Sequence, residues 1–288
     1  DLIRPHYFVS GRRGRQPYAL ELMLRIHLLQ ITYNLSDPQM EDCLHENFTV
    51  RKFVGLSMAD RTPDETTILQ FRHILEKHDL GPQIMQIVNA KINAAGLHLV
   101  KGRIVDASFI EAPTSTKNKT GTRDPEMTSG KKGNTWHFGY KAHIGADKDS
   151  GLVHTIAVTA ANVHDVSQTA SLLTGEEDSV YGDSGYLGAQ KREDAVVRNK
   201  SGRKIKYKIN RRPSQIKKLS RSGRYAAKKA EHAKSSVRAK VEHVFGVVKK
   251  QLRFCKTRYR GLEKQWAKCN MMFALADLLL ADRPCLTA

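Results

Sequence analysis

The hydrophobic pattern changes about 100 residues into the chain, and this change limits the fold classes that are open to it. Before that point apolar residues recur at helical spacing, as in residues 19–33. After it come runs with the length and composition of strands, at residues 103–111, 136–144 and 152–160. The pattern predicts an α/β fold, a mixed sheet flanked by helices, preceded by a small all-α domain.

The predicted domain boundary lies at this change of pattern. Residues 1–98 are expected to form the helical domain, and residues 99–288 the α/β domain, with a basic insertion at about 198–234. A chain of 288 residues, 40% of them hydrophobic, is long enough to bury a large core and a smaller one. The helical domain carries no catalytic groups that we identify. It is either a scaffold or dimerisation element or a module that binds DNA ends, and the sequence does not choose between them.

Helix boundaries in the first domain are marked by capping residues. Thr62-Pro63-Asp64-Glu65 resembles a capping box with Pro63 at the first helical position. Ser36-Asp37-Pro38 is expected to open an earlier helix. A further helix is predicted over residues 82–95, with Gly96 placed to end it.

The second half of the chain alternates between expected strands, loops and helices. We expect a polar, Lys-rich loop over residues 114–134 and a turn at residues 147–151. A short buried strand is predicted at residues 179–183. Helices are predicted over residues 163–173, 190–198 and 262–280.

Positive charge is concentrated in one part of the chain. The chain has 48 Lys+Arg against 29 Asp+Glu, a formal net charge of +19, which indicates a polyanionic partner. Residues 198–240 contain seventeen Lys or Arg and a single acid, Glu231. We expect this segment to hold the DNA backbone, through residues that include Arg203, Lys204, Arg211, Arg212, Lys217 and Lys218.

Membrane and disulfide-rich classes do not fit this sequence. No apolar run approaches the ~20 residues that cross a bilayer, and no signal peptide is visible. The cysteines form no CxxC pair, which argues against a zinc knuckle and fits a reducing cytoplasm; they are Cys43, Cys255, Cys269 and Cys285.

Three acidic residues that are far apart in the sequence form a candidate metal site. Asp106 and Asp183 each end an apolar, strand-like run, so we expect them at adjacent strand ends. Glu242 lies on a predicted helix that also carries Arg238 and Lys249, and at about 100° per residue these three share one narrow face. Phosphodiester chemistry with two Mg²⁺ ions about 3.5–4 Å apart requires carboxylates of this kind.

Each acid also has a structural interpretation. Asp106 follows a strand-like run and resembles a turn former, and Asp183 resembles the first residue of an Asx-turn. Glu242 is four residues from Arg238, a spacing at which the two form a helical ion pair. The adjacent face of the same helix is expected to pack inward through Val237, Val241, Phe245, Val248 and Leu252.

Several blocks of sequence together resemble one family. They are Pro63–Arg72, Val105–Pro113, Ser115–Lys119, Arg123–Met127, Gly133–Gly139, Lys141–His143, Thr159–Asn162, His164-Asp165, Asp183 with Gly185-Tyr186, and Arg238, Glu242 and Lys249 in an Arg-x3-Glu-x6-Lys spacing. On these blocks the chain resembles bacterial insertion-sequence transposases of the DDE class, most closely the insertion sequence five family. Related transposases often carry Tyr three residues before the Arg, where this chain has Ser235.

The resemblance implies a ribonuclease H-like catalytic domain with Asp106, Asp183 and Glu242 as ligands of two Mg²⁺ ions, which Mn²⁺ could replace. It implies cleavage at the terminal inverted repeats of an element and joining of 3′-OH ends to target DNA. The expected partners are DNA and further copies of the chain, at least a dimer on paired ends, with no membrane and no small-molecule substrate. The expected location is the bacterial cytoplasm, at the nucleoid. A nuclease that only cuts and a non-catalytic, domesticated DNA-binding copy are the alternatives.

Further residues are expected to lie beside the site or in the core. Arg238 and Lys249 are expected to contact DNA phosphates, with the ion pair to Glu242 as the alternative. Lys141 and His143 alternate on a predicted strand, so both face one side, either toward the site or in a structural role. For Trp136, core packing is favoured over stacking on a base. His164-Asp165 is expected to form a helix N-cap.

Overall fold

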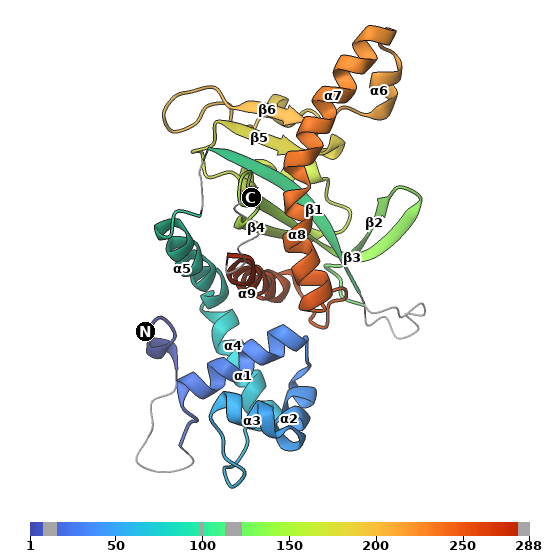
Figure 1. Ribbon diagram of the computed structural model, residues 1–288. Coiled ribbons are helices and arrows are strands. Elements are labelled where there is room, and N and C mark those ends of the chain that lie inside the picture. Colours follow the sequence, from blue (N-terminus) through green and yellow to red (C-terminus); the bar gives the residue numbers. More distant parts are fainter. Residues whose placement is uncertain (8–15, 98–100, 113–122, 282–288) are drawn as a thin grey trace.

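The computed structural model describes residues 1–7, 16–97, 101–112 and 123–281 (Figure 1). The predicted boundary between residues 98 and 99 and the block Ser115–Lys119 lie outside these ranges. The first third of the chain is helical, as expected. After a short 3₁₀ turn at Arg4–His6 it forms α1 (Leu20–Tyr33), α2 (Asp37–Glu46), α3 (Phe48–Val54), α4 (Glu65–Lys77) and α5 (Leu80–Ala94).

Two of the predicted helix boundaries are confirmed, and one is wrong. Ser36 caps α2 in a capping box with Gln39, and Gly96 adopts the left-handed conformation (φ +74°) after α5. The cap of α4 is Asp64, not Thr62, because the Asp64 carboxylate accepts the backbone N–H of Thr67 at 2.8 Å. The Thr62 hydroxyl instead contacts His45 Nε2 at 3.0 Å, which removes it from the helix end.

The remainder of the chain builds one mixed sheet. Its strands are β1 (Gly102–Glu111), β2 (Thr128–Lys132), β3 (Thr135–Asp147), β4 (Val153–Ala160), β5 (Ser179–Gly182) and β6 (Lys206–Ile209). The order is β2-β3-β1-β5-β6, with β4 also paired to β3. Strands β1 to β4 pair antiparallel, whereas β5 is parallel to both β1 and β6. This confirms the predicted α/β class and the ribonuclease H-like arrangement.

Three predicted segments between the strands are wrong. Residues 128–132 of the expected Lys-rich loop form β2. Residues 163–173 form two 3₁₀ turns, Asp165–Gln168 and Ala170–Leu172, instead of a helix. Hydroxyls of this segment donate to carbonyls three residues back, and such bonds compete with helical ones; the donors are Ser167, Thr169 and Ser171. Residues 190–198 contain no helix beyond the end of a 3₁₀ turn at Ala189–Lys191, after which Arg192 is extended.

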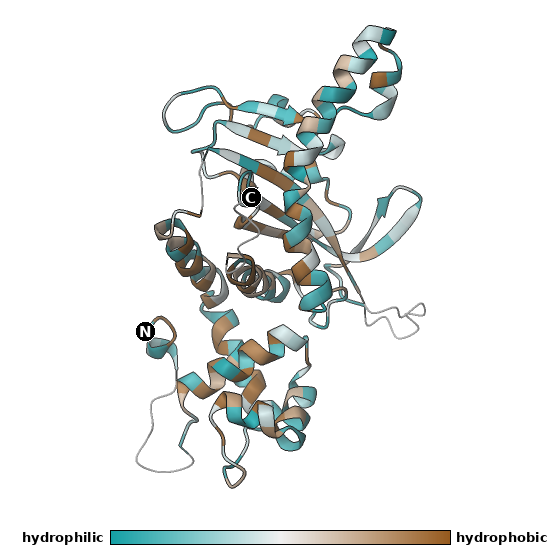
Figure 2. Cartoon of the chain, in the orientation of Figure 1, coloured by the Kyte–Doolittle hydropathy of each residue, from teal (hydrophilic) through white to brown (hydrophobic). Residues whose placement is uncertain are grey.

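Each face of the sheet has its own hydrophobic core. On one face Ile104 and Ile144 pack with α5, α8 (Lys240–Gly246) and α9 (Leu262–Ala281). On the other face Val105 and Val180 pack with the segments that follow β4 and β5. Figure 2 shows hydrophobic residues concentrated on the strands and on α5 and α9. Among the described residues, no helix is both long and apolar enough to cross a bilayer.

The helix predicted from Arg238 to Lys249 is divided into three segments. Helix α7 (Arg221–Arg238) ends there, α8 follows, and a π-helix (Val247–Gln251) continues from α8. The π-helix arises because Leu252 N–H bonds to the Val247 carbonyl, five residues back. The inward face is nevertheless confirmed, since all five of its apolar residues belong to or pack on the first core.

Basic residues 211–238, called the basic arm below, extend from the sheet (Figure 1). The arm consists of α6 (Pro213–Lys217), α7 and the turn between them. None of the α7 side chains is buried. Ser220 caps the start of the helix, and Glu231 and Lys234 bond it to residues at the end of β6. The strand β6 and both helices of this segment were not expected from the sequence, where the charge obscures any hydrophobic period.

Candidate active site

The pairing of β1 with β5 brings two of the predicted acids together. The parallel register sets Ile104 beside Tyr181, and two residues further along each chain lie Asp106 and Asp183. Asp183 directly follows β5, as expected for a strand end. Asp106 differs from the expectation, because β1 continues past it to Glu111 and the residue sits in mid-strand.

Asp106 lies between an anion and a cation. Its Oδ1 accepts the backbone N–H of Ala107 at 2.9 Å, and its Oδ2 lies 4.0 Å from Arg238 Nε. Burial raises the pKa of Asp106 to about 6, and the negative charge of Asp183 adds to the rise. The Ala107 N–H and the Arg238 guanidinium oppose it without cancelling it. A carboxylate in this position favours binding a proton or a metal cation.

Asp183 makes the Asx-turn that the sequence allowed. Its Oδ1 accepts the N–H of Gly185 at 2.8 Å. A Cβ on Gly185 would lie 2.9 Å from that oxygen, so glycine suits this position. Within the described residues Asp183 Oδ2 receives no hydrogen bond, so the turn and a ligand role are compatible.

Glu242 is not gathered with the two aspartates. It is exposed on α8, and the described part of the chain holds no group of three His, Cys, Asp or Glu residues arranged to hold a metal ion. Among the same residues, the ion pair of Arg238 is with Asp106 and not with Glu242. The structure thus brings together Asp106, Asp183 and Arg238, and leaves Glu242 on the next helical segment.

One lysine acts electrostatically on Asp106, and a second lies within range of the first. Lys249 is half-buried in the π-helix, and burial lowers its pKa, with a further lowering from the positive charge of Lys132. The charge of Lys132 also acts on Asp106. Sequence reasoning missed Lys132 because it assigned β2 to a loop; the Gly133-Asn134 turn signal beside Trp136 would have indicated a hairpin.

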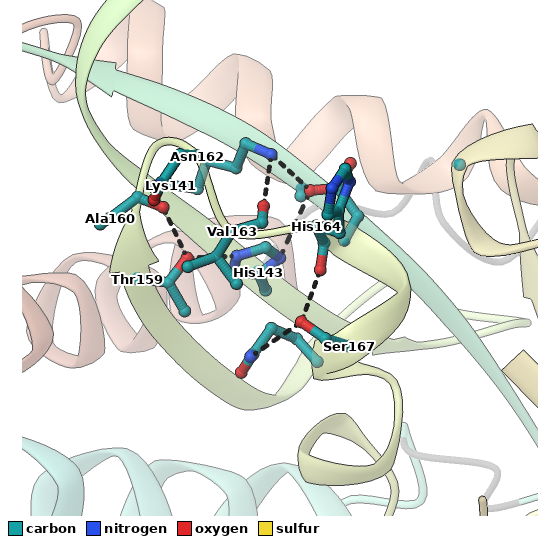
Figure 3. Close-up of polar contacts among 12 residues, drawn as sticks. Lys141, His143, Thr159, Ala160, Asn162, Val163, His164 and Ser167 are labelled. Atoms are coloured by element: carbon teal, nitrogen blue, oxygen red, sulfur yellow. Dashed lines mark hydrogen bonds and ion pairs between the residues drawn. The ribbon is translucent and has the colours of Figure 1, made fainter. Parts of the chain in front are cut away.

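Lys141 and His143, labelled in Figure 3, lie close to a further acid, Asp165. Lys141 Nζ donates to the Val163 carbonyl at 2.8 Å and to Asp165 Oδ1 at 2.9 Å. The buried His143 ring contacts Thr159 Oγ1 through Nε2 at 2.8 Å, and its Nδ1 lies 3.9 Å from Asp165 Oδ1. Burial lowers the pKa of His143 to about 4, so the ring is neutral at pH 7. Both side chains lie on the same side of β3, as predicted, and both approach Asp165 of the same chain.

Asp165 and Tyr186 lie next to the aspartate pair. A Cβ on Gly185 would be 3.6 Å from Asp165 Oδ2, so Asp165 approaches the Asp183 turn. The Tyr186 hydroxyl is buried without a hydrogen-bond partner in the described structure. Burial raises its pKa well above the usual range, and the charges of Asp106, Asp165 and Asp183 add to this. Sequence reasoning expected His164-Asp165 to be a helix N-cap. His164 does precede a turn, the 3₁₀ turn Asp165–Gln168, but no side chain caps it, and Asp165 binds Lys141.

The other predicted DNA-binding residues lie away from this pair. Four are exposed on the basic arm: Arg211, Arg212, Lys217 and Lys218. Arg203 and Lys204 are exposed before β6, and Arg203 Nη1 lies 3.8 Å from Asp178 Oδ1. Trp136 is 67% exposed, so the core packing favoured from the sequence is wrong.

The Asp106–Asp183 pair fits a hard divalent cation. Mg²⁺ takes one or two carboxylates and keeps several waters, so two adjacent aspartates suffice to start a site. The raised pKa of Asp106 is consistent with this. Burial and the charge of Asp183 both disfavour the carboxylate, and a bound cation would offset its negative charge.

Two protein-family models match the chain. One described as a transposase DDE domain matches residues 100–278, more than half of the chain, and this range includes all three predicted acids. One described as a transposase domain (DUF772) matches residues 1–74. No solved structure matches the chain.

Proposed function

The chain belongs to the transposase DDE domain family, and on that premise we propose that it cleaves DNA at the terminal inverted repeats of an insertion sequence and joins the freed 3′-OH ends to target DNA. Membership supports DNA transposase activity in general. The choice of the insertion sequence five family remains a prediction from the sequence blocks.

The observation that carries the proposal is the register of β1 against β5, which sets Asp106 beside Asp183 with Arg238 4.0 Å away. These aspartates would hold Mg²⁺, or Mn²⁺ in its place, with Glu242 as the third ligand. Two such ions supply an activated oxygen nucleophile and stabilise the leaving oxygen. Since Glu242 is on α8 and exposed, we propose that it joins the pair when DNA is bound.

The cations of the chain have separate tasks in this proposal. Arg238 and Lys249 steady the phosphates beside the acids. The basic arm, together with Arg203 and Lys204, holds the backbone of the duplex without reading its sequence. Two chains act together on paired ends, in the bacterial cytoplasm at the nucleoid, and no small molecule is consumed.

Strand joining with pre-cleaved ends tests this function. DNA ends with a free 3′-OH are mixed with a target plasmid, Mg²⁺ and the full chain, and joined products are measured. Joined products are expected from the wild type. Asp106→Asn, Asp183→Asn and Glu242→Gln should each lower joining by at least about 10³-fold, since several kcal/mol of stabilisation are lost. DNA binding should remain.

Asp194→Asn is the matched control, because Asp194 is exposed and lies outside the Asp106–Asp183 pair. Its Oδ1 is 2.9 Å from Arg192 Nε. It should join ends at the wild-type rate. Cleavage without joining would favour the nuclease. DNA binding with neither reaction would favour the non-catalytic copy.

A further inference from the structure

A projecting hairpin carries the most exposed tryptophan of the described chain. Strands β2 and β3 pair from Thr128 with Gly139 to Lys132 with Thr135, and Gly133 (φ +60°) opens the turn between them. A two-residue turn with glycine first has the sequence of a type II′ hairpin. The hairpin extends from the edge of the sheet in Figure 1.

The base of this hairpin is held firmly against the body. A Cβ on Gly130 would lie 2.2 Å from the Ala161 carbonyl oxygen, so β2 can approach the β4 end closely only with glycine there. Thr128 Oγ1 exchanges two hydrogen bonds with Asn162, both at 3.0 Å. Gly139 (φ +146°) is required as well, because its Cβ would lie 2.3 Å from the Ile110 carbonyl oxygen. The tip therefore has a defined position.

The tip presents an aromatic ring with cations around it. Trp136 is 67% exposed, and Lys131, its partner across the strands, has Nζ 5.6 Å from the ring centroid. Lys132 is exposed on the opposite side of the strand and acts electrostatically on both Asp106 and Lys249. The hairpin thus lies within electrostatic range of the candidate active site.

We propose that Trp136 and Lys131 form a stacking platform for an unpaired nucleobase at a DNA end. The proposal rests on the proposed function and names a further contact of the same substrate. An indole ring stacks on the face of any base, and adjacent lysines attract the phosphates on either side. Because β2 and β3 belong to the sheet that carries Asp106, an unpaired strand that leaves the acids along the hairpin would reach this ring.

Fluorescence of 2-aminopurine tests the platform with the full chain. The probes are two short duplexes, one with the 2-aminopurine in an unpaired 3′ tail and one with it fully paired. Trp136→Ala should weaken binding of the tailed probe by about 5- to 150-fold and remove the quenching that stacking causes. Trp136→Phe should restore most of both effects. The paired probe should change by less than about twofold.

Phe48→Ala is the matched control, because Phe48 is 60% exposed in the helical domain. It should leave both probes unaffected, and thermal unfolding should be unchanged in all three variants. Equal losses on the two probes, or no loss on either, would overturn the platform. A shift of Trp136→Ala toward monomer in sedimentation, with unchanged quenching, would assign the ring to a protein interface and also overturn it. If quenching depends on Trp136 but the wild type joins no ends, the platform stands and the transposase proposal fails.

Discussion

Arg238, the last residue of α7, lies 4.0 Å from Asp106 in the middle of β1, although 132 residues separate them in the chain. Arg238 Nε is buried and has no hydrogen-bond partner in the described structure. The guanidinium therefore occupies the approach to Asp106 without being fully bound to it. In the proposed reaction Arg238 would share that carboxylate with a metal ion and would itself contact a phosphate.

Arg238→Met is expected to have opposite effects on metal binding and on cleavage. Removing the positive charge beside Asp106 should make the binding free energy of Mn²⁺ more favourable by on the order of 1 kcal/mol. Mn²⁺ should therefore bind about fivefold more tightly to the free protein. DNA cleavage should fall by at least about tenfold, because a phosphate contact is lost. Electron paramagnetic resonance of free Mn²⁺ measures metal binding, and a gel assay measures DNA cleavage. Arg221→Met, on the same helix, should leave Mn²⁺ binding unchanged; weaker Mn²⁺ binding in Arg238→Met would contradict the assignment.

The basic arm should dominate the salt dependence of DNA binding. Each exposed cation that neutralises a phosphate would release counterions from DNA. Each such contact steepens the fall of the logarithm of the binding constant with the logarithm of the salt concentration by about 0.9. Glutamine at Lys217, Lys218, Arg221 and Arg224 should therefore flatten the slope by roughly 3 to 4. Binding is measured by anisotropy over a series of salt concentrations. The same change at the exposed lysines Lys52, Lys77, Lys91 and Lys264 alters net charge equally, and an equal flattening there would place the DNA path elsewhere.

Lys141 is expected to support the Asp183 turn instead of contacting DNA. Its ammonium is bound to Asp165 and to the Val163 carbonyl, and its side chain is only 12% exposed. Lys141→Met should lower cleavage by about 10- to 100-fold, the range typical of residues that orient metal ligands. The salt slope should not change. In a double-mutant cycle with Asp165→Asn the effects should be strongly non-additive. A slope reduced by about 1 in Lys141→Met would mean that it binds a phosphate after all.

The buried ion pair of Arg103 and Glu177 predicts acid-sensitive stability. Glu177 accepts from Arg103 Nη2 at 2.8 Å, and both side chains are almost fully buried. Burial raises the pKa of Glu177, but the Thr174 N–H and the Arg103 charge outweigh it and hold the pKa below the usual range. A lowered folded pKa stabilises the fold above the unfolded value, about 4.3, and this stability is lost as the pH falls through the folded pKa.

Glu177→Gln should therefore lower the free energy of unfolding at pH 7 by about 3–5 kcal/mol, because Arg103 stays buried and unpaired. The loss should be smaller at acid pH. Urea denaturation at both pH values measures it. Asp194→Asn, which breaks an exposed pair with Arg192, should cost less than about 0.5 kcal/mol at either pH. A pH-independent difference between Glu177→Gln and the wild type would exclude the linkage.

Much of the architecture could be predicted from the sequence, because it depends on hydrophobic period. The strands around Asp106 and Tyr140 are short apolar runs bounded by polar or turn-forming residues, and the helix ending at Tyr33 carries apolar residues at helical spacing. The segment after Val163 could not be predicted, since its hydroxyls bond to nearby carbonyls and replace helical bonds with 3₁₀ turns. Helix α7 was missed for a different reason: none of its side chains is buried, and those that bond it to the end of β6 are the charged Glu231 and Lys234.

The site was predicted in part. Asp106 and Asp183 were chosen from strand ends and family blocks, and the parallel register that brings them together is set by long-range pairing. The placement of Glu242 could not follow from a regular helix, because α7 ends at Arg238 and a π-helix begins at Val247. Lys132 and Asp165 come from segments with no period, and only the folded chain shows that they approach the acids.

The position of β1 has a consequence for the order in which the molecule forms. Its antiparallel neighbour β3 begins soon after it in the chain, whereas its parallel neighbour β5 is translated about seventy residues later. During synthesis on the ribosome, the edge of β1 that pairs with β5 therefore has no hydrogen-bonding partner until β5 is made. Pairing between strands that are far apart in the sequence is slow. A nascent chain that stops before Gly182 has β1 and β3 but lacks the strand that precedes Asp183. Such an unfinished polypeptide has only one of the two aspartates that the proposed reaction requires.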